Sequence, residues 1–142
     1  MKKNILIFSY DGPHKKSEDL FYISHKKNIN IKMVVLSPWE YLKKKNNFKG
    51  FKSIIDKPLL TISKVLRRLD YDYIICRHSK KEKIKQIIKK NKINLGIIFG
   101  ARILKKDIID LFEDGIINYH PGSLPQTSGL DSLYWMIRKK TK

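Results

Sequence analysis

Short runs of apolar residues alternate along this 142-residue chain with longer segments in which apolar residues recur every three or four positions. Such runs are typical of buried strands, and such recurrence is typical of amphipathic helices. Strands are predicted at residues 4–9, 30–36, 71–76, 95–100 and 116–119. Helices are predicted at residues 17–27, 59–69, 80–91 and 105–112, with a further short helix from Pro38. Between residues 43 and 55 no period is clear, and at most a short strand at 52–55 is expected.

The apolar runs contain no polar alternation, so each predicted strand is expected to be buried on both faces. Strands of this kind, separated by amphipathic helices, are characteristic of a parallel sheet covered by helices. The sequence therefore predicts the α/β class, with a Rossmann-like, mostly parallel sheet and helices on both faces. No internal repeat divides the chain, and residues 1–142 are interpreted as a single domain.

The composition excludes several classes of protein. No apolar run approaches the roughly 18 to 20 residues of a membrane span, and the first run lacks the cleavage site of a signal peptide. The single cysteine, Cys76, excludes an internal disulfide and is typical of a reducing compartment. His25 and His78 are expected on surface turns without a second metal ligand. We therefore expect a cytoplasmic protein that does not bind metal or membrane.

The chain has 31 Lys and Arg residues against 13 Asp and Glu, which gives a formal net charge of +18. An excess of this size is compatible with a surface for nucleic acid or another polyanion. However, 26 of these residues are Lys, and the Lys pairs are spread along the chain with few aromatic residues among them. A solvated surface is the simpler interpretation.

Ligands of parallel α/β sheets bind beyond the carboxyl ends of the strands. This rule selects three predicted loops, at residues 9–14, 100–104 and 118–125, which should lie at one edge. Neither a dinucleotide-binding glycine motif nor a P-loop occurs in the chain. The first loop carries His14, which can contact a phosphate or sugar of a substrate, although a solvated loop position is the simpler expectation.

The third loop has the most unusual sequence of the three. Asn118 and His120 are two residues apart, so their side chains share one face of the sheet if the strand continues that far. Pro121 and Pro125 stiffen the backbone directly after the histidine. Asn118 and His120 are therefore a candidate catalytic pair, and a histidine that caps a strand before a turn is the alternative.

From Asn94 to Ile137 the chain resembles the N-terminal catalytic domain of the folate-dependent formyltransferases. That family includes enzymes that formylate methionyl-tRNA, phosphoribosylglycinamide or sugars of surface polysaccharides. The resemblance is carried by residues 95–104 and 115–125, by Gly129 and by residues 135–137. Residues 1–93 match only in their alternation of strands and helices.

The resemblance implies transfer of a formyl group from 10-formyltetrahydrofolate to a primary amine through a tetrahedral oxyanion. Asn118 and His120 correspond to the catalytic pair, since an amide and a protonated imidazole can donate to the oxyanion and histidine can move the proton. Arg102, Ile103 and Leu104 correspond to the stretch whose backbone lies along the pterin ring of the folate. No metal and no covalent nucleophile is needed.

The third catalytic residue of the family, an aspartate, has no counterpart in this sequence. The only acidic residue beyond His120 is Asp131, which comes too early. The strands that follow in the family have no counterpart either. The chain therefore resembles a catalytic domain that lacks its C-terminal part, and weak or no activity is expected of it as it stands.

Residues 122–123 and 129–135 are more similar to the sugar-modifying members of the family, which favours the amine of a nucleotide-linked amino sugar as acceptor. One alternative is a methionyl-tRNA formyltransferase-like enzyme whose basic surface binds tRNA. Another is a non-catalytic remnant or binding module. A homodimer is compatible with each of these.

Overall fold

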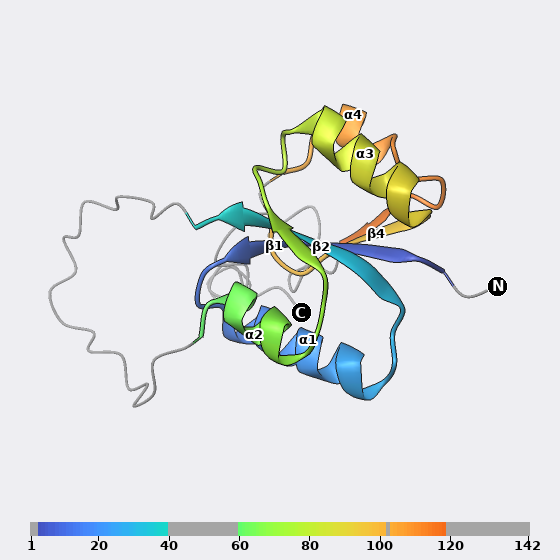
Figure 1. Ribbon diagram of the computed structural model, residues 1–142. Coiled ribbons are helices and arrows are strands. Elements are labelled where there is room, and N and C mark those ends of the chain that lie inside the picture. Colours follow the sequence, from blue (N-terminus) through green and yellow to red (C-terminus); the bar gives the residue numbers. More distant parts are fainter. Residues whose placement is uncertain (1–2, 40–59, 102, 119–142) are drawn as a thin grey trace, which may run out of the picture.

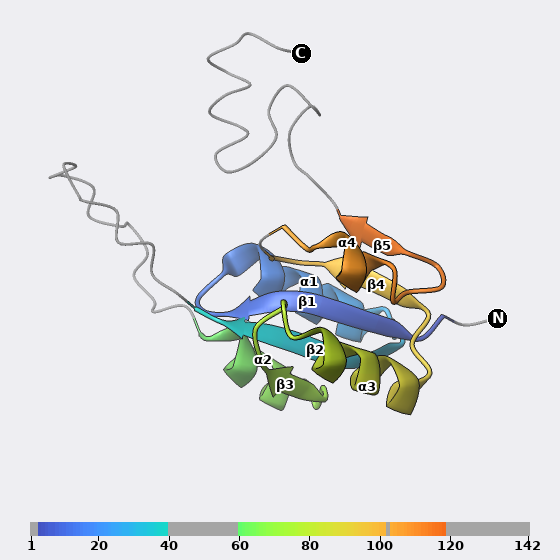
Figure 2. The same ribbon diagram turned by 90° about the horizontal axis from the view of Figure 1, so that it is seen from above.

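The computed structural model of this chain describes residues 3–39, 60–101 and 103–118. Their strands form one parallel sheet in the order β3-β2-β1-β4-β5 (Figure 2). The strands are β1 (Ile5–Asp11), β2 (Ile31–Pro38), β3 (Tyr73–Ile75), β4 (Leu95–Ile98) and β5 (Ile116–Asn118). The helices are α1 (Lys15–Lys26), α2 (Ile62–Arg68), α3 (Lys81–Asn91) and α4 (Lys106–Ile109). The predicted Rossmann-like α/β class is confirmed.

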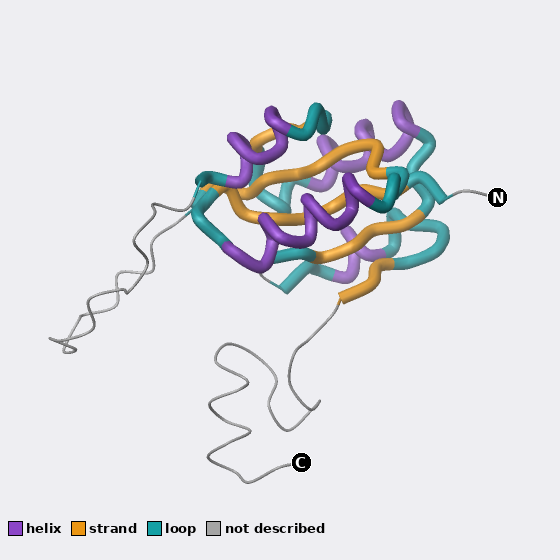
Figure 3. The backbone as a smooth tube through the Cα atoms, turned by 90° about the horizontal axis from the view of Figure 1, so that it is seen from below, coloured by secondary structure: helices purple, strands orange, loops and turns teal. Residues whose placement is uncertain are grey.

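The sheet lies between two layers of helices, with α1 and α2 on one face and α3 and α4 on the other (Figures 1 and 3). Each face has its own apolar core. Phe21 of α1 and Leu66 of α2 pack against Ile7 on one face, and Ile84 of α3 and Ile108 of α4 belong to the core on the other. The strands are covered on both sides because their apolar runs do not alternate with polar residues.

The central strand shows this two-sided burial most clearly. The residues of β1 from Leu6 to Phe8 are fully buried, and they alternate between the two cores. Phe8 lies in register with Val35 of β2 on one side and with Ile98 of β4 on the other. Ile98 in turn lies in register with Asn118 of β5. One row of paired residues therefore runs across four neighbouring strands, β2, β1, β4 and β5.

The expected helix from Pro38 is wrong at its first residue, because Ser37 and Pro38 belong to β2. The parallel register with β1 continues to the pair Asp11 and Pro38. A proline is tolerated there because the last residue of a strand need not donate to the ladder. The expected strand at residues 52–55 lies outside the described residues.

Helix α4 is shorter than the sequence predicted and ends at Ile109. The backbone N–H groups of Leu111 and Phe112 bond to carbonyls three residues earlier, those of Ile108 and Ile109. This tighter turn brings the Phe112 ring into the core beneath α3 and α4, where it is 5% exposed. The helix thus ends before residue 112, and the ring is buried in this core.

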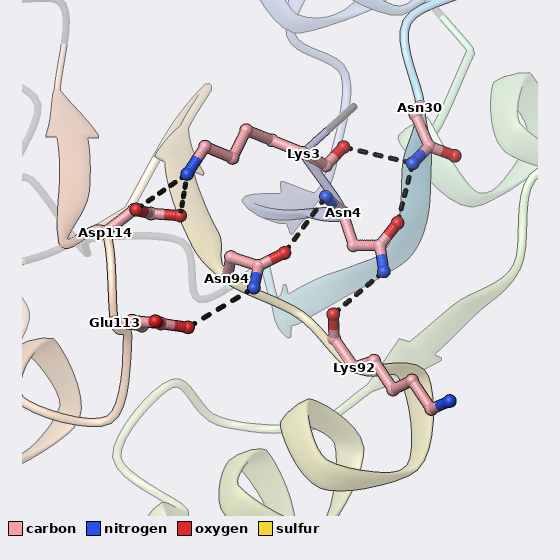
Figure 4. A network of polar contacts seen from close by, with 7 residues as sticks. All are labelled: Lys3, Asn4, Asn30, Lys92, Asn94, Glu113 and Asp114. Carbon is pink, nitrogen blue, oxygen red and sulfur yellow. Dashed lines mark hydrogen bonds and ion pairs between the residues drawn. The ribbon is translucent and has the colours of Figure 1, made fainter. Parts of the chain in front are cut away.

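Side-chain amides join the amino ends of the strands (Figure 4). Asn4 donates from Nδ2 to the Lys92 carbonyl at 2.8 Å, and its Oδ1 accepts from Asn30 Nδ2 at 2.7 Å. Asn94 accepts through Oδ1 from the Asn4 backbone N–H and donates from Nδ2 to Glu113, each at 3.4 Å. The segments before β1, β2 and β4 are thereby connected at the edge opposite the expected ligand edge.

Candidate functional site

The strand order reverses between β1 and β4, which makes their carboxyl ends the topological switch point of the sheet. In open parallel sheets this is where ligands bind. The loop after β1, the loop after β4 and the end of β5 all lie at this edge, as the sequence predicted. Arg102 and residues 119–125 lie outside the described part of the chain, so His120 is not described.

Asn118 is the last residue of β5, and its side chain is exposed. Ile116, two residues earlier, packs against the core beneath α3 and α4, so Asn118 points to the same side of the sheet. Neighbouring strands are about 4.8 Å apart, which puts Asn118 roughly 10 Å from Phe8 across β4. An exposed amide is therefore available within two strand spacings of the switch point.

A buried polar cluster joins the loop after β1 to the loop after β4. Ser17 on α1 donates from Oγ to the Phe99 carbonyl at 3.2 Å, and Ser9 Oγ donates to Ser17 Oγ at 3.4 Å. His14 Nδ1 lies 2.5 Å from the same Ser17 Oγ. Both serines are fully buried. The expectation of a solvated His14 is wrong, because the ring is half-buried against this cluster.

The spacing of three residues between His14 and Ser17 at the start of a helix is the sequence signal that points to this contact. The sequence does not show what holds the Ser17 hydroxyl in place for this contact, because its other partner is a carbonyl 82 residues further along the chain. Burial, and then the positive charge of Lys16, lower the pKa of His14 from its ordinary value of 6.5.

His78 is buried, and its expected position on a surface turn is wrong. Its Nε2 donates to the Val35 carbonyl at 3.1 Å, and its ring meets the edge of Phe8 with the centroids 5.2 Å apart. Burial lowers the pKa of His78 from 6.5, while its hydrogen bonds to the backbone of Val35 and Ser9 oppose that change. His78 thus has a packing role beside the switch point.

Aromatic residues also lie at the carboxyl ends of β1 and β2. The Tyr10 and Trp39 rings meet edge to face with centroids 5.8 Å apart. Gly12 lies directly beneath the indole, because a β-carbon at that position would be 2.3 Å from a Trp39 ring carbon. Any larger residue at position 12 would displace Trp39.

Known proteins similar to this chain include formyltransferases. Over 55 residues the chain is 45% identical to the methionyl-tRNA formyltransferase of Mycoplasma genitalium. These residues make up 38% of the chain and 18% of that protein. A solved glycinamide ribonucleotide transformylase from Symbiobacterium toebii matches 99% of the chain with a TM-score of 0.66 and 14% identity. A phosphoribosylglycinamide formyltransferase from Campylobacter jejuni matches 94% of it with a TM-score of 0.61 and 20% identity. No protein-family profile matches the chain.

The chain has the formyltransferase fold. It spans 62% of the Symbiobacterium structure and 66% of the Campylobacter structure. The resemblance to formyltransferases that the sequence indicated is therefore confirmed, by a fold match that covers 99% of the chain and by sequence over one segment of 55 residues.

Within the formyltransferase fold, Ile103 and Leu104 follow β4 at the carboxyl edge. The Ile103 side chain is 99% exposed, whereas Leu104 is partly buried against the core beneath α3 and α4. Leu104 and Asn118 thus lie on the same side of the sheet. One apolar side chain anchors this short segment, and the other projects from it into solvent.

A groove of about 390 Å³ lies at the other edge of the sheet, between the ends of α1 and α2. His25, Asn28 and Asp70 are among its lining residues. Because it is at the amino edge of the strands, it is separate from the candidate site. Among the described residues there is no group of three metal-ligating side chains, and no helix of sufficient length and hydropathy to cross a membrane.

Proposed function

We propose that this chain carries the formyl-transfer site of a folate-dependent formyltransferase. The donor is 10-formyltetrahydrofolate and the acceptor is a primary amine. The amine nitrogen attacks the formyl carbon to form a tetrahedral oxyanion, the bond to N10 of the folate breaks, and the proton lost by the amine ends on N10. The products are a formamide and tetrahydrofolate.

The observation that carries the proposal is the exposed amide of Asn118 at the carboxyl end of β5, in a chain with the formyltransferase fold. An amide N–H₂ group can donate to the oxygen on which negative charge develops, which is the largest catalytic effect available in acyl transfer. His120 is proposed as its partner, as the second donor and as the group that moves the proton.

The segment that contains Arg102, Ile103 and Leu104 is proposed to bind the pterin ring of the donor. An isoleucine that is 99% exposed at the ligand edge supports this assignment, because a flat apolar ring can cover it without displacing any core residue. The anchored side chain of Leu104 keeps the segment on the same side of the sheet as Asn118.

For the acceptor we propose the amine of a nucleotide-linked amino sugar, on the basis of residues 122–123 and 129–135. The described lysines lie on helices of both faces and near both ends of the strands instead of gathering at the ligand edge, and this favours a small acceptor over tRNA. The similarity to a methionyl-tRNA formyltransferase supports methionyl-tRNA as the second candidate.

The experiment is a transfer assay with the full chain and 10-formyltetrahydrofolate. Three amines are supplied separately, namely a nucleotide-linked amino sugar, glycinamide ribonucleotide and methionyl-tRNA, and the formylated product is identified by mass. Transfer to the amino sugar is expected. Transfer to methionyl-tRNA alone would favour the second candidate, and transfer that persists unchanged in His120→Ala would contradict the site.

A further inference from the structure

The hydrogen-bond partners in the buried serine cluster bear on which ring nitrogen of His14 carries the proton. A serine hydroxyl has one hydrogen, and that of Ser17 is donated to the Phe99 carbonyl. All three contacts of Ser17 Oγ are hydrogen bonds only when it accepts from both Ser9 Oγ and His14 Nδ1. This assignment places a hydrogen on Nδ1 of His14, across the contact of 2.5 Å.

A neutral imidazole has one N–H, so a hydrogen on Nδ1 leaves a lone pair on Nε2. The lowered pKa of His14, which arises from burial and from Lys16, is consistent with a neutral ring near neutral pH. Among the residues that the structure describes, none forms a hydrogen bond with Nε2. The ring therefore offers a fixed acceptor that the described fold does not use.

The ring lies at the switch point between β1 and β4. A β-carbon built at Gly100, two residues after the end of β4, would lie 3.7 Å from Cε1 of His14, the carbon between the two ring nitrogens. The same point is 3.6 Å from Tyr10 and 3.6 Å from Ser17. The His14 ring is thus held beside Gly100 in the β4 loop, at the start of α1, while Asn118 lies on the side of the sheet that Ile116 faces.

We propose that His14 accepts, through Nε2, a hydrogen bond from an N–H or O–H group of the substrate that binds over the carboxyl ends of β1 and β4. Ser17 is a positioning residue, since it acts only by holding the imidazole in this tautomer. The inference rests on the proposed formyl transfer, because the substrate group that donates this hydrogen bond belongs either to the amine acceptor or to the folate donor. A substrate that presents an anion at this point would not be recognised, because the lone pair would repel it.

The tautomer can be tested without any substrate. In the full chain labelled with ¹⁵N-histidine, the NMR spectrum near neutral pH is expected to show a protonated Nδ1 and an unprotonated Nε2 for His14. In Ser17→Ala the fixed tautomer should be lost. A protonated Nε2, or a doubly protonated ring, would overturn the proposal.

Two substitutions separate the roles of the two ring nitrogens. His14→Asn keeps a donor close to the Nδ1 position but has no group at Nε2, whereas His14→Gln puts an amide oxygen near the Nε2 position. We expect His14→Asn to raise the KM for one of the two substrates about 3- to 10-fold, which is the effect of one lost hydrogen bond. The kcat should remain nearly unchanged. His14→Gln should restore much of that loss, and His25→Asn, at the other end of the same helix, is the matched control.

Two KM values are measured, one for the amine and one for 10-formyltetrahydrofolate. The one that rises in His14→Asn identifies the substrate that donates the hydrogen bond. If both KM values stay at the wild-type level in His14→Asn, the proposal is wrong. If the wild-type chain transfers no formyl group to any amine, the proposed function fails by itself. The His14 inference is then decided by titrating the same donor and amines into the labelled chain. A shift of the Nε2 resonance with one of them supports it, and no shift with any of them overturns it.

Discussion

Asp11, at the end of β1, accepts a hydrogen bond of 3.0 Å through Oδ1 from the backbone N–H of Ser63, in the first turn of α2. The two residues are separated by 52 positions. N–H groups in the first turn of a helix have no partner within the helix, and a carboxylate is favoured there by the helix dipole. The end of the central strand therefore determines where α2 begins.

We expect Asp11→Ala to lower the free energy of unfolding by about 1 kcal/mol, because it leaves the Ser63 N–H without its acceptor. Asp11→Asn should lose less, since its amide oxygen can still accept. Urea unfolding gives the comparison. The control is Asp19→Ala, which removes only an exposed ion pair with Lys15. It should lower the free energy of unfolding by only about 0.3 kcal/mol. Equal losses in Asp11→Ala and Asp19→Ala would contradict the capping role.

Asn118→Ala is expected to reduce kcat by about 100- to 1000-fold, the usual effect of removing one donor to an oxyanion. Asn118→Asp should be no better, because a carboxylate cannot donate and would repel the negative charge. KM for both substrates should remain close to the wild-type value, since the interaction forms in the transition state. Steady-state kinetics on the preferred amine tests this, and a variant with unaltered kcat would remove Asn118 from the site.

Ile103→Ser is expected to raise KM for 10-formyltetrahydrofolate about tenfold, because the folate ring would lose an apolar surface to cover. The same change should leave the unfolding midpoint unaltered, since this side chain is 99% exposed. Ile23→Ser is a matched control, because Ile23 is an exposed isoleucine on α1. An equal rise in KM in both variants would show that the effect is not local to the folate site.

The stability of the folded chain is expected to fall as the pH is lowered through about 6.5. Burial lowers the pKa of His78 below that value, so the unfolded chain takes up a proton before the folded chain does. The stability contributed by neutral, buried His78 is fully present above pH 6.5. It is lost progressively as the pH falls from 6.5 to the pKa of His78 in the folded chain. His78→Gln can donate to the Val35 carbonyl without titrating, and it should show a shallower decline in urea unfolding between neutral and mildly acid pH. An unchanged decline would contradict the assignment to His78.

Asn4→Ala is expected to lower the free energy of unfolding by about 1 to 2 kcal/mol, because it removes the bonds of its side chain to Lys92 and to Asn30 at the amino ends of the strands (Figure 4). Lys3→Ala is the matched control at the same edge. It removes an exposed ion pair with Asp114 and should cost less than half as much. Thermal unfolding of both variants tests this difference.

The class of fold was predictable because it depends on local pattern. Uninterrupted apolar runs at residues 5–8 and 95–98 indicated buried strands, and the isoleucines of α3 indicated the face that packs on the sheet. The rule for parallel sheets then placed the loops after β1, β4 and β5 at one edge. The functional assignment came from a resemblance over residues 94–137, of which the structure describes the first part.

The errors concern residues whose surroundings come from distant parts of the chain. His78 was expected at the surface, but the carbonyl of Val35 and the ring of Phe8 bury it. Pro38 was expected to begin a helix, but the register with β1 keeps it in the strand. In each case the local sequence permits both outcomes, and a contact with another strand selects one of them.

The sequence by itself determined that this chain forms a helix-covered parallel sheet, and which of its loops share the ligand edge. Periodicity and strand direction are enough for that, because both are properties of consecutive residues. Only the tertiary structure decided the strand order and the contacts that hold His14. Those contacts depend on a serine from one element and a carbonyl from another, 82 residues apart, and a network of that kind exists only after the sheet has formed.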